Sequence, residues 1–261
     1  MLSSLRDRFK SEFTEFVRLD SYRGGYHKDR IERMRKMELD TRLGGLAKLL
    51  ESKNSGAVFD AMTEQQRLQA FDWIIRDNAS SREHGNDDLE RILRDGGSKW
   101  KVGVRNGQPG LEDRVPQGVQ DAADQAMAHP GDAGRLLSEA WHATYGINPQ
   151  ADLGYRKSIE AVEAVVLPLV TPNDAAATLG KAIGQMRSDG DWKLPFIKEH
   201  AQNPSPGVVL GMMQALWSGH SDRHPGTPSY IQSTQQAAEA AVSLAVTLVN
   251  LFSSGGIARR P

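Results

Sequence analysis

The spacing of apolar residues constrains the fold of this chain more than any other sequence feature. Through most of the 261 residues, apolar side chains recur every three or four positions, which is the spacing of amphipathic helices. Strict alternation occurs in one stretch, Lys99–Arg105, where Trp100, Val102 and Val104 share one face of a predicted strand. The pattern predicts a mainly α fold, a multi-helix bundle with one small β-hairpin near residues 98–115.

Glycine, proline and capping residues predict where these elements begin and end. Thr63 and Gln66 have the spacing of a capping box at a helix start. Asn106-Gly107 is a strong hairpin turn pair, although Pro109-Gly110 is expected to lengthen the loop. Pro168 is expected to end a helix, and Asn173 or Asp174 to cap the next one. The helices are expected over residues 4–19, 27–50, 64–75, 87–94, 117–128, 132–145, 151–167, 174–186, 207–217 and 229–252.

Composition changes along the chain and predicts two parts. The first part is rich in charged residues, whereas the second is rich in alanine and valine. We therefore expect an N-terminal charged helical region over residues 1–96. Residues 97–261 are expected to form the β-hairpin and a C-terminal helical bundle.

Charge and cysteine content exclude several classes of function. The chain has no cysteine, which excludes disulfides, thiolate catalysis and cysteine metal sites. Its formal net charge of -1 predicts no general electrostatic attraction to nucleic acid. Residues 1–50 carry 12 Lys/Arg against 8 Asp/Glu, which fits a basic arm or a solvated helical face.

The start of the sequence is charged where a signal peptide is apolar. The longest apolar run, Ala240–Phe252, is shorter than the roughly 20 residues that cross a bilayer. We therefore expect a cytoplasmic protein with no membrane partner. No nucleotide-binding glycine pattern is present, and no cofactor is predicted.

The polar segment Ser218–Gly226 is the best candidate for a functional site, because it stands between two apolar predicted helices. It gathers His220, Asp222, Arg223 and His224. Imidazoles transfer protons near neutral pH, and a guanidinium binds phosphate and offsets charge in a phosphorus-centred transition state. These groups suit metal-free cleavage of RNA, in which the 2′-hydroxyl attacks the adjacent phosphorus. The alternative is a polar turn in which Asp222 pairs with Arg223.

A metal site is less favoured in this segment. His220 and His224 would share a helix face, but Gly219 and Pro225 argue against a helix there. Glu163 is a further candidate, since it lies among valines on the predicted helix 151–167 and needs a partner if it is buried. We expect it either to pair with Arg223 and orient the segment or to take part in catalysis.

Several short motifs resemble a known family over about residues 90–255. The chain is similar to an actinobacterial group related to the abortive-infection C-terminal domain. The shared motifs are Ser98-x-Trp100, Gly110-Leu111, Arg114-Val115, Ala140-Trp141, Tyr145-Gly146, Ala161-Val-Glu163-Ala164, Thr178-Leu-Gly180, Leu216-Trp217 and Asp222-Arg223-His224. The resemblance implies an all-helical bundle similar to HEPN domains, which are often dimeric and metal-independent. Many of them are ribonucleases or nucleotide-modifying toxins in phage defence.

The resemblance and the polar segment together predict a phage-defence protein whose C-terminal bundle binds or cleaves RNA. Arg223 would contact phosphate, His224 or His220 would move the proton, and Asp222 or Glu163 would orient them. A homodimer is one way to bury the apolar closing helix, and burial within one chain is the other. The alternative function is a non-enzymatic helical protein–protein interaction module of a phage or bacterial host. A DNA-binding function has less support, because the chain is not basic overall and no helix-turn-helix pair is evident.

Overall fold

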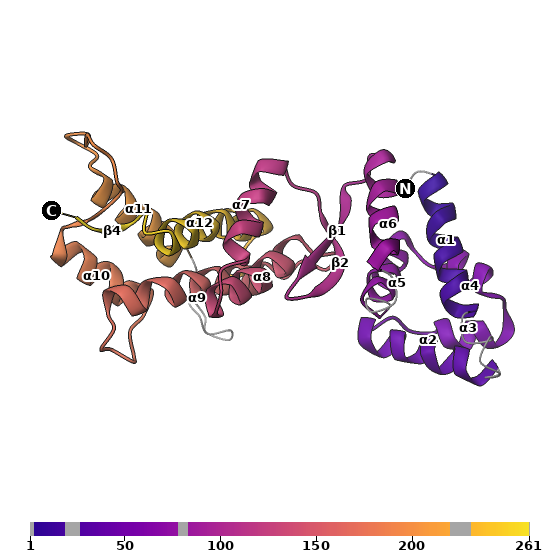
Figure 1. The fold of residues 1–261 in the computed structure, drawn as a ribbon. Coiled ribbons are helices and arrows are strands. Elements are labelled where there is room, and N and C mark those ends of the chain that lie inside the picture. Colours follow the sequence, from indigo (N-terminus) through magenta and orange to yellow (C-terminus); the bar gives the residue numbers. More distant parts are fainter. Residues whose placement is uncertain (1–2, 19–26, 78–82, 220–230, 261) are drawn as a thin grey trace. The chain divides into compact units, whose positions relative to one another are not determined.

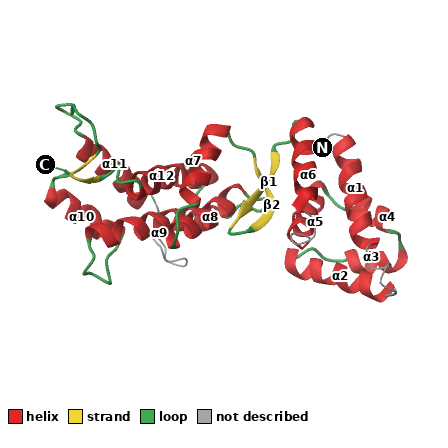
Figure 2. Ribbon diagram, viewed as in Figure 1, coloured by secondary structure: helices red, strands yellow, loops and turns green. Residues whose placement is uncertain are grey.

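A computed structural model describes residues 3–18, 27–77, 83–219 and 231–260. The chain divides into two compact units, Met1–Arg114 (unit 1) and Val115–Pro261 (unit 2). Twelve helices and two short antiparallel strand pairs are described (Figures 1 and 2), which confirms the mainly α prediction.

In its described residues, unit 1 has six helices and the hairpin. Its elements are α1 (Ser3–Arg18), α2 (His27–Thr41), α3 (Leu46–Ser52), α4 (Ser55–Ala61), α5 (Glu64–Asp77), α6 (Glu83–Asp95), β1 (Trp100–Arg105) and β2 (Gln108–Asp113). Aromatic pairs between helices fill its core: Phe9 stacks on Phe71 with ring centroids 3.9 Å apart, and Phe16 meets Trp73 edge-on at 5.6 Å.

The predicted helix 27–50 is wrong as a single element, because the chain breaks between α2 and α3. Arg42 and Gly45 have positive φ angles of 58° and 86°, which a helix cannot contain. The Glu38 carboxylate accepts the backbone N–H of Leu46 and of Ala47 and so caps α3. The capping box at Thr63 is confirmed: the Thr63 N–H donates to Gln66 over 2.8 Å, and the Gln66 N–H to the Thr63 hydroxyl over 3.2 Å.

The hairpin belongs to unit 1, so the predicted boundary after residue 96 is displaced to residue 114. Asn106 and Gly107 alone form the turn, with φ angles of 50° and 75°. Pro109 does not lengthen the loop, since it pairs with Val104 across the ladder.

Carboxylates on two helices cap both edges of this hairpin. The outward N–H of Val102 donates to Glu90 of α6 over 2.9 Å, and that of Leu111 donates to Asp72 of α5 over 2.7 Å. An exposed strand edge would otherwise be open to pairing with other chains. These bonds fix the ribbon to the two helices that precede it in sequence.

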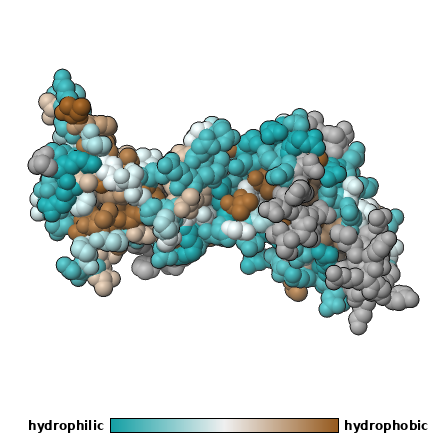
Figure 3. Space-filling view, in the orientation of Figure 1, coloured by the Kyte–Doolittle hydropathy of each residue, from teal (hydrophilic) through white to brown (hydrophobic). Residues whose placement is uncertain are grey.

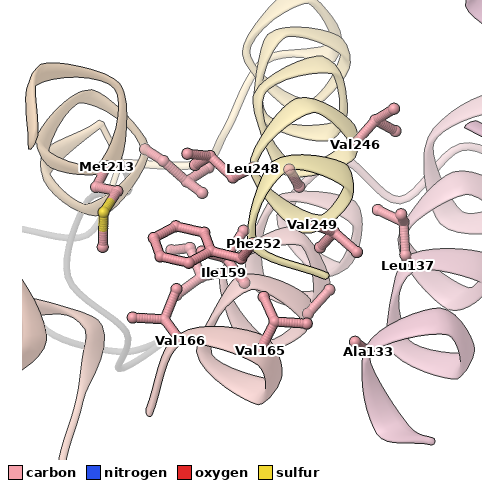
Figure 4. Close-up of a cluster of buried hydrophobic side chains, with 14 of the residues drawn as sticks. Ala133, Leu137, Ile159, Val165, Val166, Met213, Val246, Leu248, Val249 and Phe252 are labelled. Atoms are coloured by element: carbon pink, nitrogen blue, oxygen red, sulfur yellow. The ribbon is translucent and has the colours of Figure 1, made fainter. Parts of the chain in front are cut away.

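Unit 2 is an apolar helical bundle. Its elements are α7 (Gln117–Met127), α8 (Asp132–Tyr145), α9 (Ala151–Val170), α10 (Leu179–Asp189), β3 (Trp192–Lys193), α11 (Ser205–Ser218), α12 (Gln235–Ser253) and β4 (Ala258–Arg259). Figure 4 shows side chains of α8, α9, α11 and α12 meeting in its core, with Phe252 of α12 near Ile159 and Val166 of α9. The same chain therefore covers the apolar face of the closing helix.

The helix bounds in unit 2 differ most from those expected at α9, α10 and α12. Helix α9 continues through Pro168 to Val170. Helix α10 begins after Thr178, whose hydroxyl accepts the Lys181 N–H, and not after residue 173 or 174. Helix α12 begins six residues later than expected, where the Thr234 hydroxyl caps the Ala237 N–H over 3.1 Å.

Candidate functional site

The structure describes the two flanks of the polar segment and one of the five candidate residues. His220, Asp222, Arg223 and His224 lie outside the described residues, whereas Glu163 of α9 is described. The described flanks end at Gly219 and resume at Ile231.

The first flank is the C-terminal turn of α11, which lies against α9. The Tyr155 hydroxyl donates a 3.0 Å hydrogen bond to the Leu216 carbonyl. Burial raises the pKa of Tyr155, so the phenol stays protonated and able to donate. Gly219 is needed at this contact, because a Cβ atom there would overlap the phenol oxygen.

The second flank precedes α12 and lies at the same end of α9. The Ser233 N–H donates to the Asp152 carboxylate over 2.7 Å, and the Gln235 side chain donates to the Thr144 carbonyl over 2.8 Å. Asp152 and Tyr155 are three residues apart and so share one face of the helix. Both flanks are therefore held by the first turns of α9.

Glu163 lies eight residues beyond Tyr155, about 12 Å further along the helix axis. Its carboxylate accepts the backbone N–H of Leu179 over 2.8 Å and so caps α10. A carboxylate is favourable there, because the first N–H groups of a helix lack partners and carry partial positive charge. The observed partner of Glu163 is thus a helix terminus.

Trp217 links this capped terminus to α11. A Cβ atom at Gly180 would lie 3.0 Å from the Trp217 indole, so the missing side chain lets the ring lie close to the first turn of α10. Contacts therefore run from Glu163 through α10 to Trp217, three residues before His220. The motifs around Glu163, Gly180 and Trp217 therefore meet at the start of α10. This contact uses a carboxylate at position 163, the absence of a side chain at position 180 and a large ring at position 217.

Sequence reasoning missed the residues that hold the flanks. Asp152 and Tyr155 carry no motif, because each bonds a main-chain group more than 60 positions away in sequence. Thr144 was also missed. Its hydroxyl is fully buried against Gly154 and has no hydrogen-bond partner in the described part of the chain.

Among the described residues, no group of three or more His, Asp or Glu side chains is placed to hold a metal ion. One described helix, α12, has the length and composition to cross a membrane, and it packs in the core of unit 2. No protein-family model, curated protein or solved structure matches the chain.

Proposed function

We propose that unit 2 binds or cleaves RNA without a metal, at the segment that carries Arg223 and His224. One observation supports this most: both flanks of the segment are hydrogen-bonded to the same end of α9, at Asp152 and Tyr155. A polar segment on a rigid scaffold is a common position for a site. Phage defence and a homodimer belong to this proposal through the family resemblance, and a cytoplasmic location through the sequence.

The proposed reaction needs one cation and one proton carrier. Arg223 binds the phosphate and offsets charge in the transition state. His224 or His220 accepts the proton of the attacking 2′-hydroxyl, and a proton is returned to the departing 5′-oxygen. The products are a 2′,3′-cyclic phosphate and a 5′-hydroxyl end. Asp222 or Glu163 orients these groups.

The test compares wild-type protein with Arg223→Ala, His224→Ala and His220→Ala on RNA in the presence of EDTA. We expect wild type to cleave RNA, or to bind it, and to be toxic to cells when expressed. Arg223→Ala should lose at least about tenfold in rate, because transition-state donors typically contribute that much or more.

Matched control variants are available in unit 2. Arg187 of α10 and His142 of α8 are exposed side chains on described helices, so Arg187→Ala and His142→Ala should behave as wild type. Equal cleavage and binding by wild type and all three segment variants would exclude the proposal.

A second candidate function is a non-enzymatic interaction module, and the observed role of Glu163 as a helix cap favours it. Glu163→Gln keeps an acceptor oxygen for the Leu179 N–H, whereas Glu163→Ala removes it. If Glu163 only caps α10, Glu163→Gln should match wild type in melting temperature and in RNA cleavage. If Glu163 orients Arg223, Glu163→Gln should lose cleavage at an unchanged melting temperature.

A further inference from the structure

The loop from Leu194 to Ser205, here called the tip loop, is fixed by its own hydrogen bonds. Its ends meet, since the Leu194 N–H donates to the Ser205 hydroxyl oxygen over 3.1 Å. The Glu199 carboxylate accepts both the N–H and the O–H of Ser205, over 2.6 and 2.5 Å. His200 Nδ1 accepts the N–H groups of residues 202 and 203. A closed surface loop with these internal bonds is often a functional element.

The tip loop presents two adjacent large apolar side chains to solvent, here called the apolar tip. Phe196 is 63% exposed and Ile197 is 107% exposed. Figure 3 shows apolar side chains near the outer end of this loop, which joins β3 to α11, next to hydrophilic ones. The internal hydrogen bonds hold the loop in a conformation that exposes both side chains to water. Apolar side chains exposed in this way do not stabilise the fold.

Positive charge accompanies the apolar tip, although unit 2 as a whole is acidic. Unit 2 has 10 Lys/Arg and 13 Asp/Glu. Four of the ten cations are in the tip loop, in the β3–β4 strand pair or directly after it: Lys193, Lys198, Arg259 and Arg260. The guanidinium of Arg260 is held there by carbonyl groups, including that of Lys193 at 2.7 Å.

Three carboxylates at this end of unit 2, Asp189, Asp191 and Glu199, offset part of this positive charge. Asp191 pairs with Arg259 at 2.9 Å, and Glu199 is bonded to Ser205. Lys198 is exposed and follows Ile197 directly. Four cations against three carboxylates leave a net charge of +1 around the apolar tip, whereas unit 2 as a whole carries -3.

From these features we propose that the tip loop docks unit 2 on an anionic phospholipid membrane. Phe196 and Ile197 would enter the headgroup region, and the neighbouring cations would contact lipid phosphates. A bilayer accepts a protruding apolar pair without a preformed pocket, and the positive surroundings match its charge. The contact is peripheral and independent of RNA cleavage, and it departs from the expectation of no membrane partner.

The test is co-sedimentation of the full chain with vesicles. One set contains phosphatidylcholine alone, and the other contains phosphatidylcholine and phosphatidylglycerol in equal parts. We expect binding to the anionic vesicles and weaker binding at high salt, because salt screens exposed charges. Phe196→Ser with Ile197→Ser should lower the affinity at least about tenfold, since each side chain loses its burial.

Leu169→Ser is the matched control, because Leu169 is 51% exposed on α9 of the same unit. It should bind vesicles as wild type does. Binding by the double variant equal to wild type, or no binding by wild type, would overturn the proposal. Light scattering without lipid gives a second check. If wild type has a larger mass than the double variant, the apolar tip is a protein contact, and the membrane proposal is overturned.

Discussion

Glu112 is a charged residue in the interior of unit 1. Its side chain is almost completely buried, and a buried charge is unstable unless it is paired. Arg105 donates two hydrogen bonds to the carboxylate, over 2.6 and 3.0 Å, and Lys101 lies at 3.2 Å. Gly103 on the neighbouring strand leaves the space that the carboxylate occupies.

Gly103→Ala should destabilise unit 1 by about 2–4 kcal/mol, because the new methyl group displaces a buried charge from its partners. The measurement is thermal and urea denaturation of the full chain. Gly44→Ala is the control in unit 1, since a Cβ atom there meets nothing within 4 Å. An unchanged midpoint for Gly103→Ala would show that Glu112 can move without cost.

At the scale of elements, the spacing of apolar residues predicts whether a segment is a helix or a strand. It predicts the ends of that segment less well. Apolar spacing is a local property, so the helices of unit 2 and the hairpin are found near their expected places. The break after α2 depends on Glu38 reaching forward to Leu46, and β3 pairs with β4 across more than 60 residues. Similarly, Asp152 and Tyr155 form hydrogen bonds with main-chain groups that are distant in sequence. A local sequence pattern does not contain such pairings.

One ion cluster joins α2 to α5 and should make unit 1 sensitive to acid. Asp77 accepts hydrogen bonds from Arg33 at 2.9 Å and Lys36 at 3.2 Å. Burial raises the pKa of Asp77, but hydrogen bonds and charge from Arg33 and Lys36 outweigh it and hold the pKa below its ordinary value. Because the folded-state pKa is depressed, the ion cluster contributes its full stability above the pKa of Asp77 in the unfolded chain. This stability is lost as pH falls from that value through the folded pKa.

Asp77→Asn should therefore lower the melting temperature at pH 7, by the equivalent of about 0.5–1.5 kcal/mol for a partly exposed pair. The difference from wild type should begin to shrink below pH of about 4, where the unfolded chain takes up a proton at Asp77, and should vanish once the folded protein is protonated there too. Asp95→Asn is the control, because Asp95 and its partner Arg94 are both exposed. A difference that stays constant down to the acid range would contradict the ion-pair explanation.

At the scale of the whole molecule, the two units differ in composition as the sequence predicts. Unit 1 holds 22 of the 32 Lys/Arg and 20 of the 33 Asp/Glu, whereas an uncharged apolar cluster fills unit 2. Composition could not assign the hairpin, because both of its capping carboxylates come from helices that precede it. The hydrogen bonds from the hairpin to Asp72 and Glu90 therefore place the boundary after the hairpin. Fragments of the chain can test this position.

A fragment of residues 115–261 should fold by itself, because its apolar core is built from α7 to α12. We expect a helical circular dichroism spectrum and a cooperative thermal transition. A fragment of residues 97–261 should melt at the same temperature, with residues 97–114 open to protease because Asp72 and Glu90 are absent. If RNA activity belongs to unit 2, both fragments should retain it. A folded 97–261 fragment beside an unfolded 115–261 fragment would instead place the hairpin in the C-terminal part.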